Sequence, residues 1–331
     1  MSVPDHFRAF RIHNDAAGYR GAIESMAPQE LSPGELLVQA AWSSVNYKDA
    51  LAGTGEGKIL RRFPLNGGID VAGQVVASTD PAFKEGDAVI ATGCGLSETR
   101  DGGYAQYVRL ESSAAIALPT GLDLRESMIL GTAGFTAALA LFRLLENRQT
   151  PELGPLAVTG ATGGVGSLAV SIFRRAGFEV HAISGKPEHA DFLRSIGAAQ
   201  VLGRDVLATG RPLESVRFGG GLDCVGGPML ASLLAQTAPY GNVATAGLAA
   251  SAALDTTVMP FILRGVSLLG IGSAGTARDI REEVWRRLAG DWKPVHLERF
   301  ATREATLETL PEVFRSLLEG RALGRTVVRL A

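Results

Sequence analysis

The sequence predicts an α/β protein in which a doubly wound, six-stranded parallel sheet is joined to a smaller all-β domain. Three observations support this prediction. A glycine-rich turn at residues 160–166 lies between a short apolar strand and an apolar helix. Strand and helix patterns then alternate as far as residue 272. Residues 1–120 instead carry short apolar runs separated by turn residues, which is typical of a small barrel or sandwich.

Length and composition agree with a two-domain globular protein. The chain has 331 residues, of which 46% are hydrophobic and 20% charged, and its net charge is -2. This charge gives no basic field for nucleic acid, and two cysteines cannot form a disulfide framework. The N-terminus lacks the pattern of a signal peptide, and the most apolar helical run, residues 130–142, is too short to cross a bilayer. We therefore expect a cytoplasmic protein with a small-molecule substrate and neither nucleic-acid nor membrane partners.

The first domain begins with strand patterns that are separated by glycine- and proline-containing turns. One or two helical turns are expected at residues 46–51, and a glycine-rich loop follows at 53–58. The expected strands are residues 7–12, 35–42, 69–78, 87–91, 104–110 and 114–118.

The pattern becomes helical at residues 123–145, where the small residues 131–136 mark a helix start. A strand at 156–159 then enters the glycine-rich turn. A helix at 167–176 follows, and Gly177 closes it. A second strand is expected at 179–184 and completes a βαβ unit.

This βαβ unit predicts a dinucleotide site. Glycine allows the backbone to approach a pyrophosphate, and the N-terminus of the helix offers unpaired N–H groups and a positive dipole. Ala161 takes the first place of the usual G-x-G-x-x-G pattern, with Gly163 and Gly166 in the other two. We expect Gly163, Gly164, Val165 and Gly166 to contact the cofactor.

The end of the second strand indicates which dinucleotide binds. A site that prefers NAD has an acidic residue there, which holds the ribose 2′-hydroxyl. This chain has Ser184, Gly185 and Lys186 instead, and Arg204 follows the next expected strand. A hydroxyl, an open backbone and cations favour a 2′-phosphate, so we predict NADPH.

The later strands bring the sheet to about six, with strands expected at 200–202, 221–225, 242–246 and 266–272 and a helix at 229–238. The tail has helices at 279–288 and 307–319 and strands at 296–300 and 324–330. Because the tail is too short for a domain of its own, we expect it to pack onto the N-terminal domain. The predicted division is therefore 1–120 with 273–331 for the β domain, and 121–272 for the nucleotide domain.

Several motifs together make the chain resemble the medium-chain dehydrogenase/reductase superfamily over essentially its whole length. The glycine turn is one of them, and the more specific ones resemble the zinc-free acryloyl-CoA reductase group, whose members are often named quinone oxidoreductases. These are WSSVNYKDAL at 42–51, GIDVAG at 68–73, ILGTAGFTA at 129–137 and TVMPFILR at 257–264. The resemblance implies a GroES-like β-barrel beside a Rossmann domain, and a homodimer formed through the nucleotide domains. It also implies NADPH-dependent reduction of acryloyl-CoA to propanoyl-CoA.

A catalytic metal is not expected. The alcohol dehydrogenases of this superfamily use a cysteine of the first domain and a His-Glu pair that follows a glycine. Here Gly68 is followed by Ile69 and Asp70, and no cysteine lies near Asn46. The five histidines are scattered along the chain. Conjugate reduction needs no metal, because hydride adds to the β-carbon and the charge that develops on the thioester oxygen can be stabilised by hydrogen-bond donors.

The candidate site residues come from these motifs. Tyr47 is expected beside the nicotinamide as a hydrogen-bond donor and proton source, and Asn46 could orient substrate or ring. Thr132 and nearby amides could contact thioester or cofactor. Asp49 is a catalytic candidate with a structural alternative, in which it pairs with Lys48 or nearby arginines. Further cofactor contacts are expected from Thr136, Leu248, Ile271, Ser273 and Arg325, and Lys58, Arg61 and Arg62 could bind the phosphates of CoA.

Two other functions share these features. An NADPH:quinone oxidoreductase or enone reductase would have the same fold and would also need no zinc. A protein that binds NADPH without turnover would have the nucleotide site but reduce no acceptor.

Overall fold

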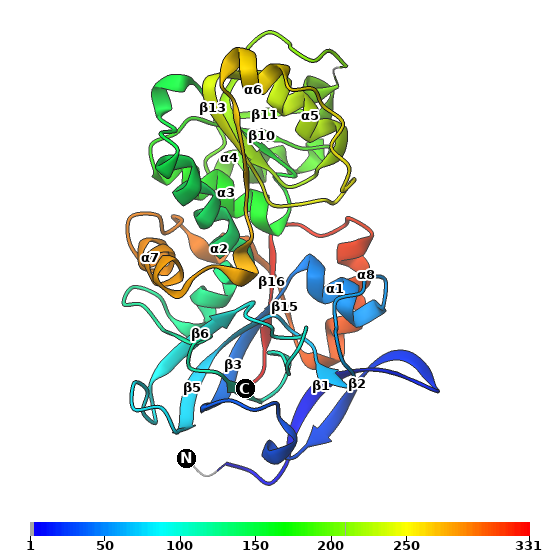
Figure 1. Cartoon of the computed structure of the whole chain (residues 1–331). Coiled ribbons are helices and arrows are strands. Elements are labelled where there is room, and N and C mark those ends of the chain that lie inside the picture. The colour runs from blue at the N-terminus through cyan, green and yellow to red at the C-terminus, as the bar shows by residue number, and fades with distance from the viewer. Residues whose placement is uncertain (1–2, 209) are drawn as a thin grey trace. The chain divides into compact units, whose positions relative to one another are not determined.

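The computed structural model describes residues 3–208 and 210–331, which form two compact units (Figure 1). Unit 1 contains Met1–Thr132, Ala274–Glu283 and Leu297–Ala331, and unit 2 contains Ala133–Ser273 and Val284–His296. The predicted boundaries at 120 and 272 differ from these. Residues 121–132 belong to unit 1, and residues 284–296 belong to unit 2.

Unit 1 is built from two sheets, as the β-rich pattern predicts. A three-stranded sheet has the order β2-β1-β4, and a larger one has the order β15-β16-β3-β5-β6-β8, with β7 paired to β3. The strands are β1 (Phe7–Asp15), β2 (Gly18–Met26), β3 (Leu36–Val45), β4 (Leu65–Asn66), β5 (Asp70–Ser78), β6 (Ala88–Thr92), β7 (Tyr107–Leu110), β8 (Ile116–Ala117), β15 (Ala301–Ala305) and β16 (Arg325–Arg329). Pairing is antiparallel except between β15 and β16.

The C-terminal segment joins the N-terminal sheet, because β16 pairs with β3 from Thr326 opposite Val45 to Arg329 opposite Trp42. Helices α1 (Tyr47–Thr54) and α8 (Leu310–Leu318) pack against each other in this unit. The ring of Phe314 on α8 lies 5.8 Å from that of Phe10 and 6.1 Å from that of Tyr104. This aromatic core therefore ties α1, the N-terminal sheet and the tail together.

Two sequence predictions in this unit need correction. The strand expected at 296–300 is wrong. Residues Leu297–Phe300 form a 3₁₀ helix, because its spacing of three buries both Leu297 and Phe300, and the strand begins at Ala301. Strand β2 was not predicted, since most of its residues are only partly buried and give no apolar alternation.

Unit 2 contains a six-stranded sheet in which every pair is parallel, as predicted. Its order is β11-β10-β9-β12-β13-β14. The strands are β9 (Leu156–Thr159), β10 (Val180–Ile183), β11 (Gln200–Leu202), β12 (Phe218–Asp223), β13 (Thr237–Thr245) and β14 (Ser267–Gly270). The order reverses between β9 and β12, which is where a doubly wound sheet binds its ligand.

The helices that connect these strands are α3 (Gly164–Arg175), α4 (Ala190–Ser195), α5 (Gly227–Ala235) and α6 (Met259–Arg264). Helix α7 (Arg278–Ala289) follows β14. Gly177 has φ +93°, which confirms that it ends the preceding helix in a left-handed conformation.

Helix α2 (Leu124–Glu146) is broken at Gly131, where φ is 50° and ψ is -156°. A second helical segment therefore starts within residues 131–136, as the small residues there predict. The whole helix is longer than the apolar run predicted from sequence, and its length and composition would allow it to cross a membrane. However, 78% of its most apolar window is buried inside the protein, as in the core helix of a globular protein.

Candidate active site

The glycine-rich turn has the geometry that a pyrophosphate site needs. Gly160 follows β9 with φ +60°, and Gly163 is the residue that precedes the first turn of α3. Gly166 allows α3 to approach the turn, since a Cβ at this position would lie 2.8 Å from Ala161 Cα and 2.9 Å from Gly160 C. The N-terminus of α3 therefore presents its N–H groups at the carboxyl end of β9.

A buried carboxylate, which the sequence analysis did not identify, lies at the same edge of the sheet. Asp223 ends β12 and is completely buried. Thr159 Oγ1 donates to Asp223 Oδ1 at 2.7 Å, and the amides of Val225 and Gly226 donate to Oδ2 at 3.2 and 2.7 Å. Burial raises the pKa of Asp223. This residue fixes the loop after β12 beside the glycine turn.

The residues predicted to bind the 2′-phosphate lie together in unit 2. Ser184 Oγ accepts a hydrogen bond from the Lys186 amide at 3.1 Å. The guanidinium of Arg204 lies over Gly185, where a Cβ would be 2.6 Å from Arg204 Cζ. Burial, together with the charge of Arg204, lowers the pKa of Lys186. Two cations beside an open backbone and a hydroxyl form a suitable site for a phosphate.

The other cofactor candidates of unit 2 follow the ends of strands or lie on α2. Leu248 comes three residues after β13 and is 61% exposed. Ile271 follows β14, and its amide donates to Thr245 O at 3.0 Å. Ser273 is half-buried, and Thr136 is buried in α2. Their contact with a cofactor stays a prediction.

In unit 1 the motif residues meet in a network of buried polar side chains centred on Asp70, which is 0% exposed. Its Oδ2 accepts from Ser44 Oγ at 2.5 Å, Asn46 Nδ2 at 2.8 Å and Thr132 N at 2.9 Å. Its Oδ1 accepts from Thr132 Oγ1 at 2.5 Å. In the sequence Asp70 marks only the place of a missing metal ligand, and this role is not predictable there because the donors come from distant segments.

Arg325 is part of the same network and is only 3% exposed. Its Nε donates to Ile129 O at 3.0 Å, Nη1 to Val45 O at 2.9 Å and to Asn46 Oδ1 at 3.2 Å, and Nη2 to Ser44 Oγ at 2.8 Å. All three nitrogens are therefore directed at acceptors of unit 1. These contacts leave no nitrogen of Arg325 directed at a cofactor, whereas a cofactor contact was expected from the sequence.

Asn46 and Thr132 also belong to this network. The side-chain nitrogen of Asn46 donates to both Asp49 Oδ2 and Asp70 Oδ2, and the side-chain oxygen accepts from Arg325. The amide and hydroxyl of Thr132 are directed at Asp70. Both residues use these polar groups inside the protein, and their contact with a substrate or cofactor stays a prediction. Tyr47, the first residue of α1, is 44% exposed and remains a candidate.

Asp49 has the structural surroundings that were considered as an alternative, but not the predicted partner. Its Oδ1 accepts from the main-chain amide of Ile69 at 2.9 Å, and its Oδ2 accepts from the main-chain amide of Asn46 at 2.8 Å. Lys48 forms its ion pair with Glu98 instead. Burial, with a further contribution from the charge of Asp70, raises the pKa of Asp49 to about 7.

The comparisons with known proteins identify the family. The model of the alcohol dehydrogenase GroES-like domain matches residues 32–120, and that of the zinc-binding dehydrogenase matches residues 164–290. The Bacillus subtilis protein named "Putative quinone oxidoreductase YhfP" is 43% identical over 98% of this chain and 99% of its own length. The chain belongs to the medium-chain dehydrogenase/reductase superfamily.

Other members of the superfamily carry more specific names. The acrylyl-CoA reductase AcuI of Ruegeria pomeroyi is 44% identical over 93% of this chain and 94% of its own length. The structure of the Salmonella enterica oxidoreductase yhdH in complex with NADP has a TM-score of 0.95 and 42% identity, covering 98% of this chain and all of that one. The structure of Bacillus subtilis yhfP with NAD bound has the same TM-score and identity over 99% of this chain and all of that one.

Among residues 3–208 and 210–331 of this medium-chain dehydrogenase/reductase, no group of three or more His, Cys, Asp or Glu side chains could hold a metal ion. The family that matches the nucleotide domain is described as zinc-binding dehydrogenase. In this chain, however, Ile69 follows Gly68 at the position where a histidine ligand was expected in such enzymes. Zinc independence stays a prediction, which metal analysis of the purified protein would test.

The predicted CoA-binding cations of unit 1 differ in their contacts. Arg62 Nε donates to Thr99 O at 2.8 Å and its Nη2 donates to Ser32 Oγ at 2.7 Å. Lys58 and Arg61 have exposed side chains. Arg62 is exposed as well, and phosphate binding by any of the three stays a prediction.

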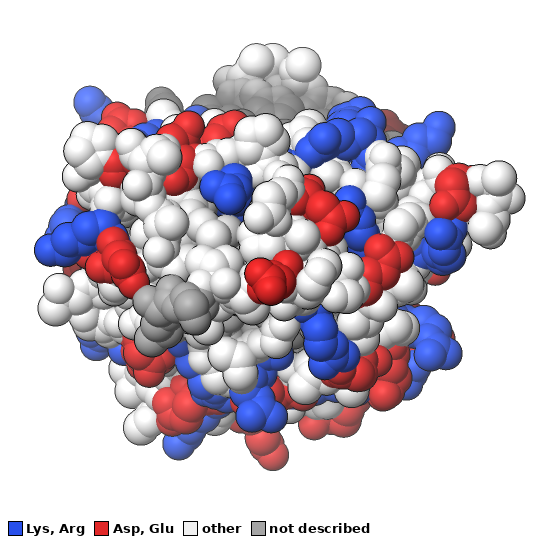
Figure 2. Space-filling view, turned by 90° about the horizontal axis from the view of Figure 1, so that it is seen from below, with Lys and Arg blue, Asp and Glu red and all other residues white. Residues whose placement is uncertain are grey.

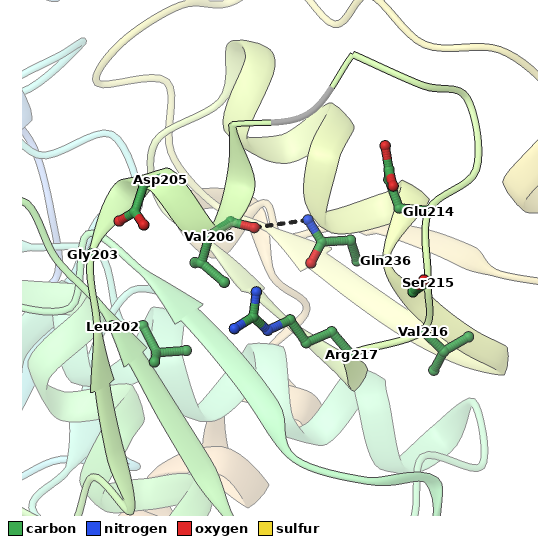
Figure 3. Close-up of a pocket in the computed structure, with 9 residues that line it drawn as sticks. All are labelled: Leu202, Gly203, Asp205, Val206, Glu214, Ser215, Val216, Arg217 and Gln236. Atoms are coloured by element: carbon green, nitrogen blue, oxygen red, sulfur yellow. Dashed lines mark hydrogen bonds between the residues drawn. The ribbon is translucent and has the colours of Figure 1, made fainter.

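A separate pocket of 560 Å³ lies in unit 2 (Figure 3). The Arg217 guanidinium points into it, and Gln236 Nε2 donates to Val206 O at 2.9 Å on its wall. Arg217 and Gln236 immediately precede β12 and β13, so they lie at the amino ends of these strands. The pocket also reaches Leu202 and Gly203 at the carboxyl end of β11.

The raised pKa of Asp49 predicts a pH-dependent stability. Between about pH 4 and pH 7, Asp49 keeps its proton in the folded protein, whereas in the unfolded chain, with an ordinary pKa of 3.8, it has already lost it. Protonation of Asp49 therefore stabilises the folded state in full below about pH 4, and this stabilisation is lost as the pH rises through about 7. From pH 5 to 8 we expect the wild-type free energy of unfolding, measured in urea, to fall by about 2–3 kcal/mol relative to Asp49→Asn. A constant difference would contradict this, and the exposed Asp5→Asn serves as control.

Proposed function

We propose that this protein reduces the activated carbon–carbon double bond of a short enoyl thioester, converting acryloyl-CoA to propanoyl-CoA with NADPH and without zinc. The chain is an NADPH-dependent oxidoreductase, and the thioester specificity is the proposed part. The observation that carries the proposal is the cationic, hydroxyl-containing site of Ser184, Lys186 and Arg204 at the end of the βαβ unit. The acrylyl-CoA reductase names of relatives at 43–44% identity support the choice of substrate.

The proposed mechanism assigns a separate task to each unit. When bound, NADPH supplies the hydride that adds to the β-carbon of the substrate. The α3 N-terminus in unit 2 binds the pyrophosphate, and Lys186 and Arg204 bind the 2′-phosphate. In unit 1, the Tyr47 hydroxyl donates a hydrogen bond to the thioester oxygen while hydride addition forms the enolate, and its proton then passes to the α-carbon; water reprotonates the tyrosinate that is left. Lys58 and Arg61 attract the phosphates of CoA.

Steady-state NADPH oxidation with acryloyl-CoA, crotonyl-CoA and a simple quinone, measured side by side, tests this function. We expect kcat/KM to be highest for acryloyl-CoA and to fall with added chain length. Lys58→Ala with Arg61→Ala should raise KM for acryloyl-CoA about tenfold and leave kcat unchanged, since the removed charges lie outside the reacting atoms. Turnover of the quinone alone would favour the second candidate, a quinone oxidoreductase, which the name of the YhfP relative supports.

The cofactor preference is predicted to depend on two cations. Lys186→Ala combined with Arg204→Ala should weaken NADPH binding about 100-fold and change NADH binding less than about threefold, because only the 2′-phosphate loses its partners. Fluorescence titration with both nucleotides measures this. Arg194→Ala provides a control, since that arginine pairs with Asp191 at an exposed position of the same unit. Equal weakening of both nucleotides, or tighter binding of NADH by the wild type, would contradict the assignment.

We also propose a homodimer that forms through the nucleotide-binding domain. Strand β14 is at one end of the six-stranded sheet, and nearby residues Val258, Ile262 and Leu263 are 65%, 72% and 62% exposed. An open strand edge beside exposed apolar side chains is typical of a subunit interface. Light scattering should give a dimer for the wild type and a monomer for the Ile262→Asp, Leu263→Asp variant. An unchanged mass of that variant would exclude this surface.

Small molecules are the proposed partners, and the cytoplasm is the proposed location. On the face shown in Figure 2, basic and acidic side chains are interspersed, so no extended field of one sign attracts nucleic acid there. The two cysteines, Cys94 and Cys224, are both free. Free cysteines are typical of proteins in a reducing compartment.

A further inference from the structure

The buried network of unit 1 connects two opposite charges through the Ser44 hydroxyl and the Asn46 side chain. Arg325 Nη2 and Asp70 Oδ2 are 3.9 Å apart, beyond normal hydrogen-bond distance. Ser44 Oγ lies between them, donating to Asp70 at 2.5 Å and accepting from Arg325 at 2.8 Å. Ser44 is fully buried at the end of β3. Ser44 therefore forms one of two side-chain bridges between these charges, and the Asn46 side chain forms the other.

The same network fixes the residues on both sides of Tyr47. Asn46, directly before it, donates to Asp70 and accepts from Arg325. Asp49, two residues after it, accepts from the amide of Asn46 and from that of Ile69. Hydrogen bonds to Asp70 on β5 and to Arg325 on β16 thereby hold the start of α1 in place. The direction of the exposed Tyr47 side chain follows from the placement of this turn.

Stability alone does not explain such an arrangement. Two carboxyl groups and one guanidinium are withdrawn from water here. Replacing a buried ion pair by apolar side chains of similar volume often leaves a protein equally stable or makes it more stable. What the charges add is a defined geometry, because each hydrogen bond has a preferred direction and length. That geometry is imposed on the first turn of α1.

We propose that Ser44 is a positioning residue, which sets the place of Tyr47 by joining Asp70 to Arg325. This inference rests on the proposed function for its kinetic consequence, although the positioning itself can be measured without any substrate. Small displacements of a reacting group are known to lower rates strongly, so the consequence should appear in kcat rather than in the binding of NADPH.

Ser43 provides a matched control for Ser44. The two residues are neighbours on β3, and both are fully buried. Ser43 Oγ donates to the main-chain oxygen of Asp70 at 2.6 Å, whereas Ser44 Oγ donates to its carboxylate. Ser43→Ala and Ser44→Ala therefore both remove a buried hydroxyl that bonds Asp70. Only Ser44→Ala removes a hydroxyl that bridges Asp70 and Arg325.

The first experiment measures position directly. The full chain is labelled with 3-fluorotyrosine, and the Tyr47 signal among its five tyrosines is assigned with Tyr47→Phe. We expect Ser44→Ala to shift or broaden the Tyr47 fluorine signal and Ser43→Ala to leave it unchanged. An unchanged Tyr47 signal in folded Ser44→Ala, checked by its melting temperature, would overturn the proposal. This result does not depend on the identity of the substrate.

The second experiment is a double-mutant cycle on kcat with acryloyl-CoA. Tyr47→Phe should lower kcat about 100-fold and Ser44→Ala about tenfold, but the double variant should be no slower than Tyr47→Phe alone. Ser43→Ala should leave kcat unchanged. Independent effects of Ser44→Ala and Tyr47→Phe that multiply, or an unchanged kcat in Ser44→Ala, would overturn the proposal. A wild type that reduces no enoyl thioester while Ser44→Ala still moves the fluorine signal would refute the proposed function only.

Discussion

Replacing Gly166 with alanine is expected to weaken NADPH binding at least about 100-fold and to destabilise unit 2 by about 1–3 kcal/mol. The added Cβ would lie 2.8 Å from Ala161 Cα and 2.9 Å from Gly160 C, and it would also contact Gly160 O. These are backbone atoms of the turn itself, so relief requires α3 to move away from β9. That movement displaces the N–H groups that we expect to bind the pyrophosphate.

Nucleotide titration and thermal unfolding measure the two effects separately. Gly163→Ala is the comparison variant, because its Cβ would approach nothing closer than Gly160 O at 3.3 Å and its φ is -78°. This variant should keep the wild-type melting temperature. If Gly166→Ala bound NADPH within threefold of the wild type, close packing of α3 on the turn would not be what shapes the site.

The contrast between these glycines shows which parts of the site the sequence could predict. The order of strand, turn and helix is local, and so is the distance from the turn to Ser184 and Lys186. A spacing along the chain is enough to place such residues at one edge of a parallel sheet. Spacing also predicts that Arg204 lies near Ser184, because Arg204 follows β11 and β11 lies next to β10.

The buried network of unit 1 was beyond that argument. Arg325 and Ser44 are 281 positions apart, and Thr132 and Asp70 are 62 apart. Asn46 and Thr132 look like ligand-binding residues when they are read beside Tyr47 and a helix start. Their side chains instead satisfy a carboxylate contributed by another strand. Whether a polar residue faces a ligand or a buried partner depends on long-range packing, which the pattern of one segment does not contain.

Removal of the buried guanidinium should have the largest effect on stability. Arg325→Met is expected to lower the free energy of unfolding by about 3–5 kcal/mol. The change leaves the Asp70 carboxylate buried without its cation. It also removes donors from the main-chain oxygens of Val45 and Ile129, which lie in the interior. An uncompensated buried charge costs much more than the pair itself contributes.

Arg329 on the same strand gives the control that makes this measurement decisive. It forms an ion pair with Glu304 at 3.3 Å, but the two side chains are 57% and 41% exposed. Arg329→Met should therefore cost only about 0.5 kcal/mol or less in urea unfolding, because water and salt screen the pair. Addition of Asp70→Asn to Arg325→Met should recover part of the lost stability, since it removes the unpaired charge. Equal losses in Arg325→Met and Arg329→Met would mean that the Asp70 carboxylate does not need its guanidinium, and the network would then not be the element that fixes the first turn of α1.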